Sequence, residues 1–418
     1  MLDISYIKDN TEKVIKGIES KNASVDVHKI IELDNAFREL SVDLQRLREK
    51  RNTNTSAISG KPTQEQIDQG KSIKEAIEKI ESALEKIKND RDTLLLQVPN
   101  IPKADVKIGK NEDENEIVKT VGKPTIFSFT PKDHVEIGKS LDIIDIERAA
   151  KVSGPRFGYL KNEGVLLEFA LKRLAFDTLL KEGFTPLLPP VLIKEEIMKG
   201  LGYMENGEDE NMYILDKDNI VLVGTAEQSM VPFHMNEVLK ESDLPKRYVG
   251  FSTSFRREAG SYGKDTKGIF RVHQFDKVEM VSFVKEGEDD KEQEYLLSLE
   301  EQFFNLLEIP YQVVKMCTGD LGFPAARKYD LEAWMPSQNK YREVTSVSTV
   351  TDFQSRRLNI KYQVGNEKKF VSILNGTAYS MNRPIIAILE NNQQADGSVH
   401  IPKILQPYIG KEKISIKQ

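Results

Sequence analysis

The chain has 418 residues, more than one ordinary hydrophobic core accommodates, so we expect at least two domains. Hydrophobic residues make up 39% and charged residues 30%, a mixture too apolar for a disordered chain and too interrupted by charge for a bundle of membrane helices. The formal net charge of -6 argues against coating of nucleic acid through bulk attraction, but it leaves room for a local basic surface.

The N-terminus and the cysteine count bear on where the protein works. Residues 1–9 contain neither the basic flank nor the apolar block of a signal peptide, and no later run reaches membrane-spanning length. We therefore expect a cytoplasmic protein with no membrane partner. Cys317 is the only cysteine, which excludes an internal disulfide, and five scattered histidines form no cluster with zinc spacing.

Two heptad stripes dominate residues 30–94. Their apolar positions are mostly three and four residues apart, which places each stripe on one face of a helix, as in a coiled coil. Thr63 and Gln66 are spaced as a capping box at the start of the second helix. We therefore predict an antiparallel helical hairpin. Its apolar positions are Ile30, Leu33, Phe37, Leu40, Leu44 and Leu47 in the first helix, and Ile73, Ile77, Ile80, Leu84, Ile87 and Leu94 in the second.

The hairpin pattern is compatible with two functions. From these residues alone, a dimerisation coiled coil is the simpler interpretation, and RNA binding is the alternative. Basic residues crowd one stretch of the first helix, although acidic and basic residues nearly balance over the hairpin as a whole. The basic residues of that stretch are Arg46, Arg48, Lys50 and Arg51.

A junction with two prolines at residues 98–102 ends the hairpin, because proline removes a hydrogen-bond donor and disfavours helix in the residue before it. We predict one domain over residues 1–105 and another over 106–418. In the second domain, strands rarely alternate regularly with helices, which indicates an α+β fold with a mainly antiparallel sheet. The candidate strands are 213–223, 246–256, 269–283, 343–351 and 368–375.

The sequence contains no phosphate-binding P-loop. Gly70-Lys71-Ser72 and Gly138-Lys139-Ser140 resemble its end, but Glu65 and Asp133 stand where its first glycine should be. A nucleotide would therefore need another kind of site.

Charged side chains alternate along the candidate strands 246–256 and 269–283. Arg256 and Glu258 share one face of the first strand. A solvated ladder of ion pairs would explain such alternation, but Val272 and Val278 can serve the core while the charges converge opposite them. Arginine for phosphate, an aromatic face for adenine and a carboxylate for an amino group suit ATP. The alternating residues of the second strand are Arg271, His273, Phe275, Lys277 and Glu279.

Several blocks of the sequence together resemble a known family. Phe255-Arg256-Arg257-Glu258, the loop 259–265 and Arg271-Val272-His273-Gln274-Phe275 resemble motif 2 of the class II aminoacyl-tRNA synthetases in its seryl form. The apolar helix expected over 166–184, with the segment up to Pro190, resembles motif 1, and residues 375–390 resemble motif 3. Gly224-Thr225-Ala226-Glu227 resembles the serine-site motif of the same family.

The resemblance implies an antiparallel-sheet class II catalytic domain preceded by a helical-hairpin arm that binds tRNA. It therefore favours RNA binding over dimerisation for the hairpin. It implies a homodimer built on motif 1, with ATP, Mg²⁺, serine and tRNA(Ser) as ligands and tRNA(Sec) as a further candidate. The basic stretch of the first hairpin helix supplies the candidate tRNA contacts Arg46, Arg48, Lys50 and Arg51.

The resemblance also assigns roles to single residues. Arg256 and Arg383 are the expected catalytic residues, with Arg256 on the α-phosphate of ATP. Glu258 is expected to contact the adenine amino group. The other expected contacts are Phe275 for adenine stacking, Arg271 with Arg383 for the distal phosphates, Glu343 and Ser346 for Mg²⁺ and ATP, and Thr225, Glu227, Arg256, Glu279, Asn375 and Thr377 for serine.

The implied reaction is activation of serine by ATP, followed by esterification of the tRNA 3′ end. Two features depart from the family pattern: residues 344–349 lack the cysteines that many members carry, and residues 153–157 contain Pro155, for which we have no functional interpretation. A paralogue that loads a carrier protein is one rival, but such proteins usually lack the long arm. A non-catalytic RNA-binding paralogue is another, but it should have lost motif residues that this chain keeps.

Overall fold

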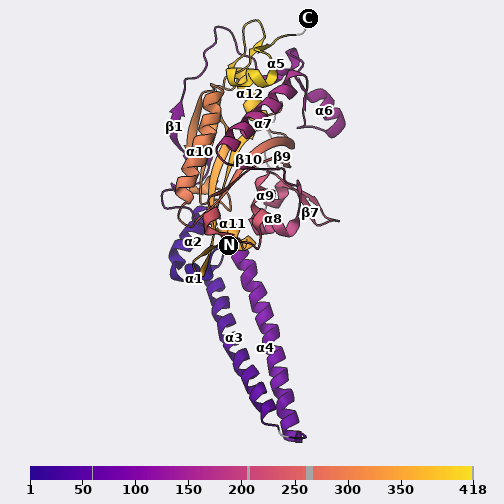
Figure 1. The fold of residues 1–418 in the computed structure, drawn as a ribbon, viewed down its shortest axis with the longest axis vertical. Coiled ribbons are helices and arrows are strands. Elements are labelled where there is room, and N and C mark those ends of the chain that lie inside the picture. The colour runs from indigo at the N-terminus through magenta and orange to yellow at the C-terminus, as the bar shows by residue number, and fades with distance from the viewer. Residues whose placement is uncertain (59, 205–207, 260–266, 417–418) are drawn as a thin grey trace. The chain divides into compact units, whose positions relative to one another are not determined.

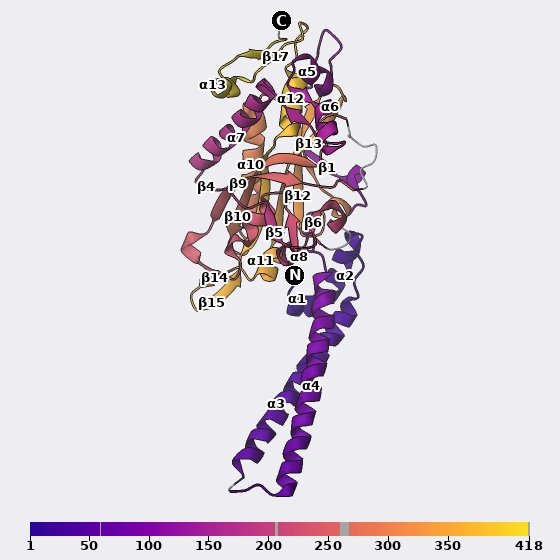
Figure 2. The ribbon, with the colours of Figure 1, turned by 90° about the vertical axis from the view of Figure 1, so that its right-hand side faces the viewer.

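The computed structural model describes residues 1–58, 60–204, 208–259 and 267–416. They divide into two compact units, Met1–Ile101 and Pro102–Gln418, a division slightly before the predicted boundary after residue 105. Figures 1 and 2 show the elements of each unit. Within the described ranges, no helix is both long enough and apolar enough to cross a membrane.

The first unit contains the predicted helical hairpin, which is confirmed. Figures 1 and 2 show its two long helices side by side, and Leu44, Ile73, Ile77 and Leu84 are buried along the seam between them. The predicted capping box is also confirmed, since the Gln66 N–H donates to Thr63 Oγ1 at 3.3 Å and the Thr63 N–H donates to Gln66 Oε1 at 2.9 Å. The helices of this unit are α1 (Ile4–Asp9), α2 (Thr11–Ser20), α3 (Val27–Ser56) and α4 (Gln64–Leu96).

A buried carboxylate ties the base of this hairpin together. Asp34 on α3 lies 2.6 Å from Lys8 Nζ of α1, 2.9 Å from Arg38 Nε of α3 and 2.9 Å from Arg91 Nη1 of α4. Its side chain is only 4% exposed. Burial opposes ionisation, but Lys8 and Arg38 outweigh it and lower the pKa of Asp34 below its ordinary value.

The second unit is built on an eight-stranded sheet with the order β1-β11-β12-β13-β16-β10-β9-β4. All neighbouring strands are antiparallel except β4 and β9, which are parallel. The predicted α+β class with a mainly antiparallel sheet is therefore confirmed. The strands are β1 (Glu116–Val121), β4 (Thr185–Leu187), β9 (Lys246–Phe255), β10 (Gln274–Val284), β11 (Tyr311–Lys315), β12 (Arg327–Met335), β13 (Lys340–Thr351) and β16 (Ser372–Ser380).

The longest helices of this unit share the main hydrophobic core with the sheet. The helices are α7 (Glu163–Lys181), α10 (Asp289–Leu306) and α12 (Asn382–Asn391), and their buried residues form one cluster with those of β10, β12, β13 and β16. Helix α7 is the apolar helix expected over 166–184. The shorter helices are α5 (His134–Ser140), α6 (Ile146–Ser153), α8 (Glu195–Leu201), α9 (Glu227–Met230), α11 (Phe353–Leu358) and α13 (Gln406–Ile409).

Small sheets and short 3-10 turns complete the unit. The remaining strands are β2 (Ile144–Asp145), β3 (Tyr159–Leu160), β5 (Leu192–Lys194), β6 (Tyr213–Leu215), β7 (Ile220–Leu222), β8 (Val238–Lys240), β14 (Lys361–Val364), β15 (Glu367–Phe370), β17 (Val399–His400) and β18 (Lys413–Ile414). The 3-10 turns are η1 (Glu112–Glu114), η2 (Glu208–Asn211), η3 (Val231–His234), η4 (Glu241–Asp243), η5 (Thr318–Asp320) and η6 (Lys403–Leu405).

Three of the predicted strands were wrong in their limits. Residues 213–223 form the hairpin β6–β7 rather than one strand, because Asn219 adopts a left-handed conformation with φ +53°. Residues 368–375 divide between β15 and β16, which belong to different sheets. Residues 269–273 precede β10 instead of forming its start, because part of their main chain bonds to residues outside the sheet, such as Arg156 and Asn382.

A β-bulge in β13 decides which side chains share a face. Thr345 pairs with Leu331 and Glu343 pairs with Glu332, so Val344 is an extra residue in the ladder. Residues three apart on a regular strand point to opposite faces, but one extra residue restores the same face. Glu343 and Ser346 can therefore reach the same side of the sheet.

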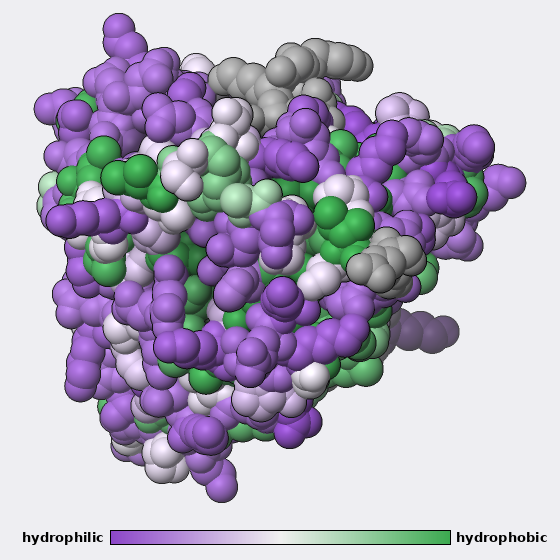
Figure 3. All heavy atoms as spheres, turned by 90° about the horizontal axis from the view of Figure 1, so that it is seen from above, coloured by the Kyte–Doolittle hydropathy of each residue, from purple (hydrophilic) through white to green (hydrophobic). Residues whose placement is uncertain are grey.

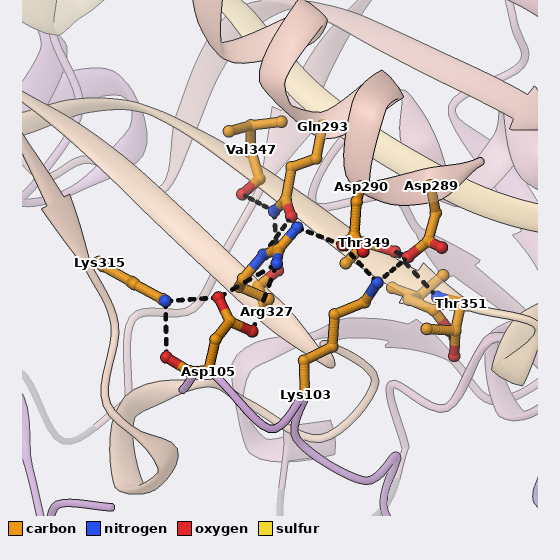
Figure 4. A network of polar contacts seen from close by, with 11 residues as sticks. Lys103, Asp105, Asp289, Asp290, Gln293, Lys315, Arg327, Val347, Thr349 and Thr351 are labelled. Carbon is orange, nitrogen blue, oxygen red and sulfur yellow. Dashed lines mark hydrogen bonds and ion pairs between the residues drawn. The ribbon is translucent and has the colours of Figure 1, made fainter. Parts of the chain in front are cut away.

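A polar network anchors the segment that follows Ile101 to the sheet (Figure 4). Arg327 at the start of β12 donates to Gln293 Oε1 at 2.8 Å, to Asp290 Oδ1 at 2.6 Å and to Asp105 Oδ2 at 3.2 Å. Lys103 Nζ lies 2.6 Å from Asp289 Oδ2, which also accepts a hydrogen bond from Thr349 Oγ1 of β13. We call Lys103, Asp105, Asp289, Asp290, Gln293, Arg327 and Thr349 the anchor network.

The face seen in Figure 3 is mainly hydrophilic, with hydrophobic residues in separate smaller patches. This pattern agrees with the 30% share of charged residues. Helix α7 carries several exposed apolar side chains: Leu166 is 41%, Phe169 59% and Leu180 44% exposed.

Candidate active site

Two adjoining cavities open along the central strands of the second unit. The first has a volume of about 180 Å³ and the second about 540 Å³. Every residue expected at the catalytic site lines at least one of them. The residues lining the first cavity include Arg256, Glu258, Arg271, Phe275, Glu343, Ser346, Thr377 and Arg383, and those lining the second include Thr225, Glu227, Arg256, Glu258, Arg271, Glu279, Ser346 and Asn375.

Arg256 lies where the two cavities meet. It follows the last residue of β9, its Nε donates to the Gly224 carbonyl at 3.3 Å, and its guanidinium lies 5.4 Å from the centroid of the Phe275 ring. Its main chain pairs with His273, whose carbonyl accepts the Arg256 N–H at 2.9 Å. Arg256 is therefore fixed at the backbone while its side chain is exposed toward both cavities.

Glu258 and Arg271 face each other across the first cavity. Arg271 Nη1 lies 3.6 Å from Glu258 Oε2, and Glu258 has a left-handed backbone with φ +52°. Arg271 Nε is buried and has no hydrogen-bond partner among the described residues. A buried, unsatisfied donor is costly, so this guanidinium is suited to an anionic ligand that enters the cavity.

Glu343 and Arg383 form the far side of the first cavity. Arg383 Nη1 donates to Glu343 Oε2 at 3.0 Å and to the Glu343 carbonyl at 2.8 Å, and its guanidinium lies 5.0 Å from the centroid of the Phe270 ring. Burial opposes ionisation of Glu343, but Arg383 and Lys328 outweigh it and lower the pKa of Glu343 to about 2. The carboxylate is therefore ionised at neutral pH, beside the Ser346 hydroxyl on the same cavity.

Two buried carboxylates face the second cavity. Glu279 on β10 is 1% exposed and its Oε2 lies 2.6 Å from Lys277 Nζ. Burial raises the pKa of Glu279 to about 7, although Lys277 opposes that rise. Glu227 is 3% exposed and accepts hydrogen bonds from Tyr203 Oη at 2.9 Å and Gln354 Nε2 at 3.3 Å. Burial also raises the pKa of Glu227.

The remaining expected serine contacts come from β16 and from the segment before α9. Asn375 and Thr377 alternate with Leu374 and Ala378, which belong to the main core. Asn375 and Thr225 line the second cavity, whereas Thr377 lines only the first. Thr377 lies opposite Glu279 in the ladder between β16 and β10, so it stands next to another expected serine contact.

A buried glutamate holds two of the cavity strands from behind. Glu300 on α10 is 0% exposed. Its Oε2 accepts the Thr345 hydroxyl at 2.7 Å and its Oε1 accepts the Thr377 N–H at 3.0 Å. Burial raises the pKa of Glu300 well above its ordinary value. Glu300 therefore fixes β13 and β16 relative to each other beneath the cavities.

The sequence did not identify every residue that the structure places at or beside these cavities. Lys328 lines both cavities and lies 3.1 Å from Asp330 Oδ1. Lys277, which the sequence placed on the charged face of its strand without a role, also lines both. Alternation on β12, where Lys328 and Asp330 are two apart, is the signal that could have identified that pair. Arg156 was noted only as part of an unexplained segment, yet it contacts Glu258. In the expected motif 2 loop, residues 260–265 lie outside the described ranges.

The candidate tRNA contacts belong to the first unit, whereas the residues that line the cavities belong to the second. Arg46, Arg48, Lys50 and Arg51 are all exposed on α3. Arg48 Nη2 donates to Glu81 Oε1 of α4 at 2.7 Å, and Arg46 lies 3.5 Å from Asp43. Exposed pairs of this kind contribute little to stability, so they hold Arg46 and Arg48 only weakly.

Comparisons with known proteins agree with both units. Residues 1–102 match the family model described as "Seryl-tRNA synthetase N-terminal domain", and residues 212–392 match "tRNA synthetase class II core domain (G, H, P, S and T)". A serine–tRNA ligase of Treponema denticola is 44% identical over 99% of this chain and 100% of that protein, and one of Dictyoglomus thermophilum is 45% identical over 100% of both.

Two solved structures are similar to this chain over its full length. Seryl-tRNA synthetase from Pyrococcus horikoshii, complexed with ATP, is 39% identical with a TM-score of 0.94 and covers 100% of both chains. Cytoplasmic serine–tRNA ligase from Naegleria fowleri, in complex with AMP, is 34% identical with a TM-score of 0.89 and covers 100% of this chain and 99% of that one. The chain therefore belongs to the seryl-tRNA synthetases, a family of class II aminoacyl-tRNA synthetases.

Proposed function

We propose that this chain activates serine with ATP to give seryl-adenylate and pyrophosphate, and then transfers the seryl group to the 3′-terminal adenosine of tRNA(Ser). The proposal includes tRNA(Sec) as a second acceptor. The observation that carries it is the meeting of the expected ATP contacts and the expected serine contacts in two adjoining cavities that share Arg256. Relatives named serine–tRNA ligases support it.

The first cavity is suited to ATP. Arg256, Arg271 and Arg383 bring three guanidinium groups to one small space, and such groups bind phosphate oxygens through paired donors. Phe275 offers a ring for adenine, and Glu258 offers an acceptor for the adenine amino group. The unsatisfied Arg271 Nε adds a donor that a phosphate would satisfy.

Glu343 and Ser346 fit the requirements of Mg²⁺. Magnesium prefers hard oxygen ligands, usually one or two carboxylates together with substrate phosphates. The low pKa of Glu343 keeps its carboxylate ionised, and Ser346 adds a hydroxyl oxygen on the same cavity. These two residues would hold the ion, which when bound supplies positive charge against the phosphates of ATP.

Activation of serine needs no general base. The carboxylate of serine is already ionised at neutral pH, so it can attack the α-phosphorus directly and expel pyrophosphate. Catalysis then rests on placing the two reactants together and on stabilising the charge that develops at the phosphate, which we assign to Arg256 and Arg383. The 3′-hydroxyl of tRNA then attacks the carbonyl carbon of seryl-adenylate and releases AMP.

The second cavity supplies the selectivity for serine. The Glu279 carboxylate is suited to the ammonium group of the amino acid, with Glu227 and Thr225 beside it. Polar groups that pair with the serine hydroxyl would be left unpaired by alanine, which costs about 1–3 kcal/mol for each buried group. Threonine would be rejected by the space that its extra methyl group needs.

We assign tRNA binding to the domain 1–105 and catalysis to the domain 106–418. The exposed basic residues of α3 support contact with the tRNA backbone, since each phosphate contact depends on local rather than net charge. We further propose that the protein is cytoplasmic.

We also propose a homodimer formed through α7. Three apolar side chains of that helix, Leu166, Phe169 and Leu180, are exposed, and a shallow groove of about 370 Å³ lies between Phe169, Phe176 and Leu180. Exposed apolar residues clustered on one helix mark an interaction surface more often than free surface. A twofold arrangement would bury the same patch on both copies.

The experiment that tests the proposal is exchange of labelled pyrophosphate into ATP, measured with each of the twenty amino acids in turn, without tRNA and with Mg²⁺. We expect exchange with serine alone. Exchange with glycine or alanine instead would favour a protein that loads a carrier protein, and no exchange with any amino acid would favour a non-catalytic RNA-binding protein.

A deletion separates the two steps. Removing residues 31–95 should leave serine-dependent exchange intact and abolish charging of tRNA(Ser), because the catalytic residues all lie in the second unit. Loss of both activities would contradict the assignment of tRNA binding to the hairpin. Charging of tRNA(Sec) transcripts by the intact chain tests the second acceptor.

A further inference from the structure

Arg156 lies outside both cavities but holds the residues that line them. It belongs to the segment between α6 and β3, and it is not among the residues that line either cavity. Its backbone is left-handed, with φ +63°, a conformation that is uncommon for residues other than glycine and marks a constrained position. The Arg156 carbonyl accepts the His273 N–H at 3.0 Å, which fixes that conformation against the start of β10.

The guanidinium of Arg156 connects the two arms of motif 2. Its Nη1 donates to the Glu258 carbonyl at 3.3 Å, and its Nε donates to the Arg271 carbonyl at 3.5 Å. One planar group therefore bonds to the main chain on both sides of the loop that separates Glu258 from Arg271. The planar guanidinium of arginine donates in two fixed directions at once, whereas the ammonium group of lysine is a compact point charge whose donors rotate.

The same guanidinium also faces the carboxylate of Glu258. Arg156 Nη2 lies 4.0 Å from Glu258 Oε2, and Arg271 Nη1 lies 3.6 Å from the same oxygen. The side chains of Arg156 and Glu258 are 17% and 18% exposed. Glu258 therefore stands between two positive charges. The hydrogen bond from Arg156 Nη1 to the Glu258 carbonyl also holds the left-handed backbone of Glu258 in place.

We propose that Arg156 is a positioning residue that orients Glu258 toward the adenine amino group, and so contributes to the selection of ATP over other purine nucleotides. The inference rests on the proposed function, in which Glu258 contacts adenine. Arg156 acts through Glu258 and through the main chain of Arg271, without touching the nucleotide.

The test compares two nucleotides in serine-dependent pyrophosphate exchange: ATP, and purine riboside triphosphate, which lacks the 6-amino group. The measured quantity is the ratio of kcat/KM for ATP to that for the analogue. A hydrogen bond to a charged acceptor contributes about 1.5–3 kcal/mol, so we expect the unmodified chain to prefer ATP by about 10- to 150-fold. Glu258→Ala should bring this ratio close to one.

Arg156→Met should lower the ratio at least fivefold, and Arg156→Lys should lower it less, since lysine keeps the charge but not the fork. In the Glu258→Ala background, Arg156→Met should change the ratio no further, because both act on one contact. Arg148→Gln on the neighbouring helix α6 is the matched control, since Arg148 is exposed and pairs with Asp145, and its ratio should stay unchanged.

The outcomes separate the inference from the proposed function. If Glu258→Ala removes the preference but Arg156→Met and Arg156→Lys lower kcat/KM for both nucleotides equally, Arg156 is only structural and the inference is overturned. If the unmodified chain shows no exchange, the proposed function fails. If Glu258→Ala leaves the preference intact, the proposed role of Glu258 fails. If Arg156→Met does not fold, as judged by its thermal melt, the ratio for Arg156→Lys decides.

Discussion

The affinity for serine should depend on pH through Glu279. Burial raises the pKa of this carboxylate to about 7, and only its ionised form can pair with the ammonium group of serine. For a group with that pKa, the ionised fraction falls from about nine tenths at pH 8 to about one tenth at pH 6. The KM for serine should therefore rise about tenfold over this interval and change little between pH 8 and pH 9.

Lys277 sets the pH at the midpoint of this change in the KM for serine. Its Nζ lies 2.6 Å from Glu279 Oε2, so Lys277→Met removes the cation that stabilises the ionised form. One unit of pKa corresponds to about 1.4 kcal/mol, and losing a charge partner at this distance in a buried site costs more than that. We expect this midpoint to move up by more than one unit, to above pH 8, so more than half of Glu279 would be protonated at pH 8 and the KM for serine at that pH should rise at least about twofold.

The assay is pyrophosphate exchange at saturating ATP, with serine varied from pH 6 to pH 9. Glu279→Gln is the matched control, because an amide does not titrate and its KM for serine, although high, should not change with pH. The KM for ATP, measured in the same buffers, controls for general loss of activity. A KM for serine that stays constant from pH 6 to pH 8, or a midpoint that Lys277→Met leaves in place, would refute the reasoning.

Three further predictions concern catalysis, assembly and stability. Arg256→Ala should lower serine-dependent exchange by about 10²–10³-fold, since a charge directed at the reacting phosphate contributes about 3–4 kcal/mol in a closed site; near-normal exchange would exclude its catalytic role. Phe169→Asp should convert a dimer to monomers in sedimentation, because each copy loses about 1.5–3 kcal/mol of apolar burial; an unchanged dimer would place the interface elsewhere. Arg327→Ala should destabilise the protein to urea by about 1–3 kcal/mol, because it leaves the buried Gln293 Oε1 without its donor, whereas the exposed Arg148→Ala should change stability by less than about 1 kcal/mol.

Sequence patterns predicted the features that depend on local periodicity. The hairpin was predictable because its heptads and the capping box of Thr63 and Gln66 lie within single helices. The antiparallel sheet followed from strands without regular helical connections. The start of β10 was predicted wrongly because His273 and the residues before it bond to distant parts of the chain, which no periodicity records.

The site residues were identifiable by resemblance, but their arrangement was not. Glu343 and Ser346 are three apart, which on a regular strand would separate them, and the bulge at Val344 that brings them to one cavity has no clear sequence signal. Lys328 lies in a strand that was not predicted. Arg156 owes its contacts to a left-handed backbone, a conformation that its residue type does not predict.

The anchor network has a consequence for building chimeric proteins. Lys103 and Asp105 belong by contact to the sheet that carries the cavities, since they bond to Asp289, Asp290 and Arg327. A hybrid that takes its hairpin from a relative should therefore be joined at residues 101 and 102. A junction after residue 105 would replace Lys103 and Asp105 with foreign side chains and leave Arg327 to find new partners, so such a hybrid should lose stability even when its hairpin folds correctly.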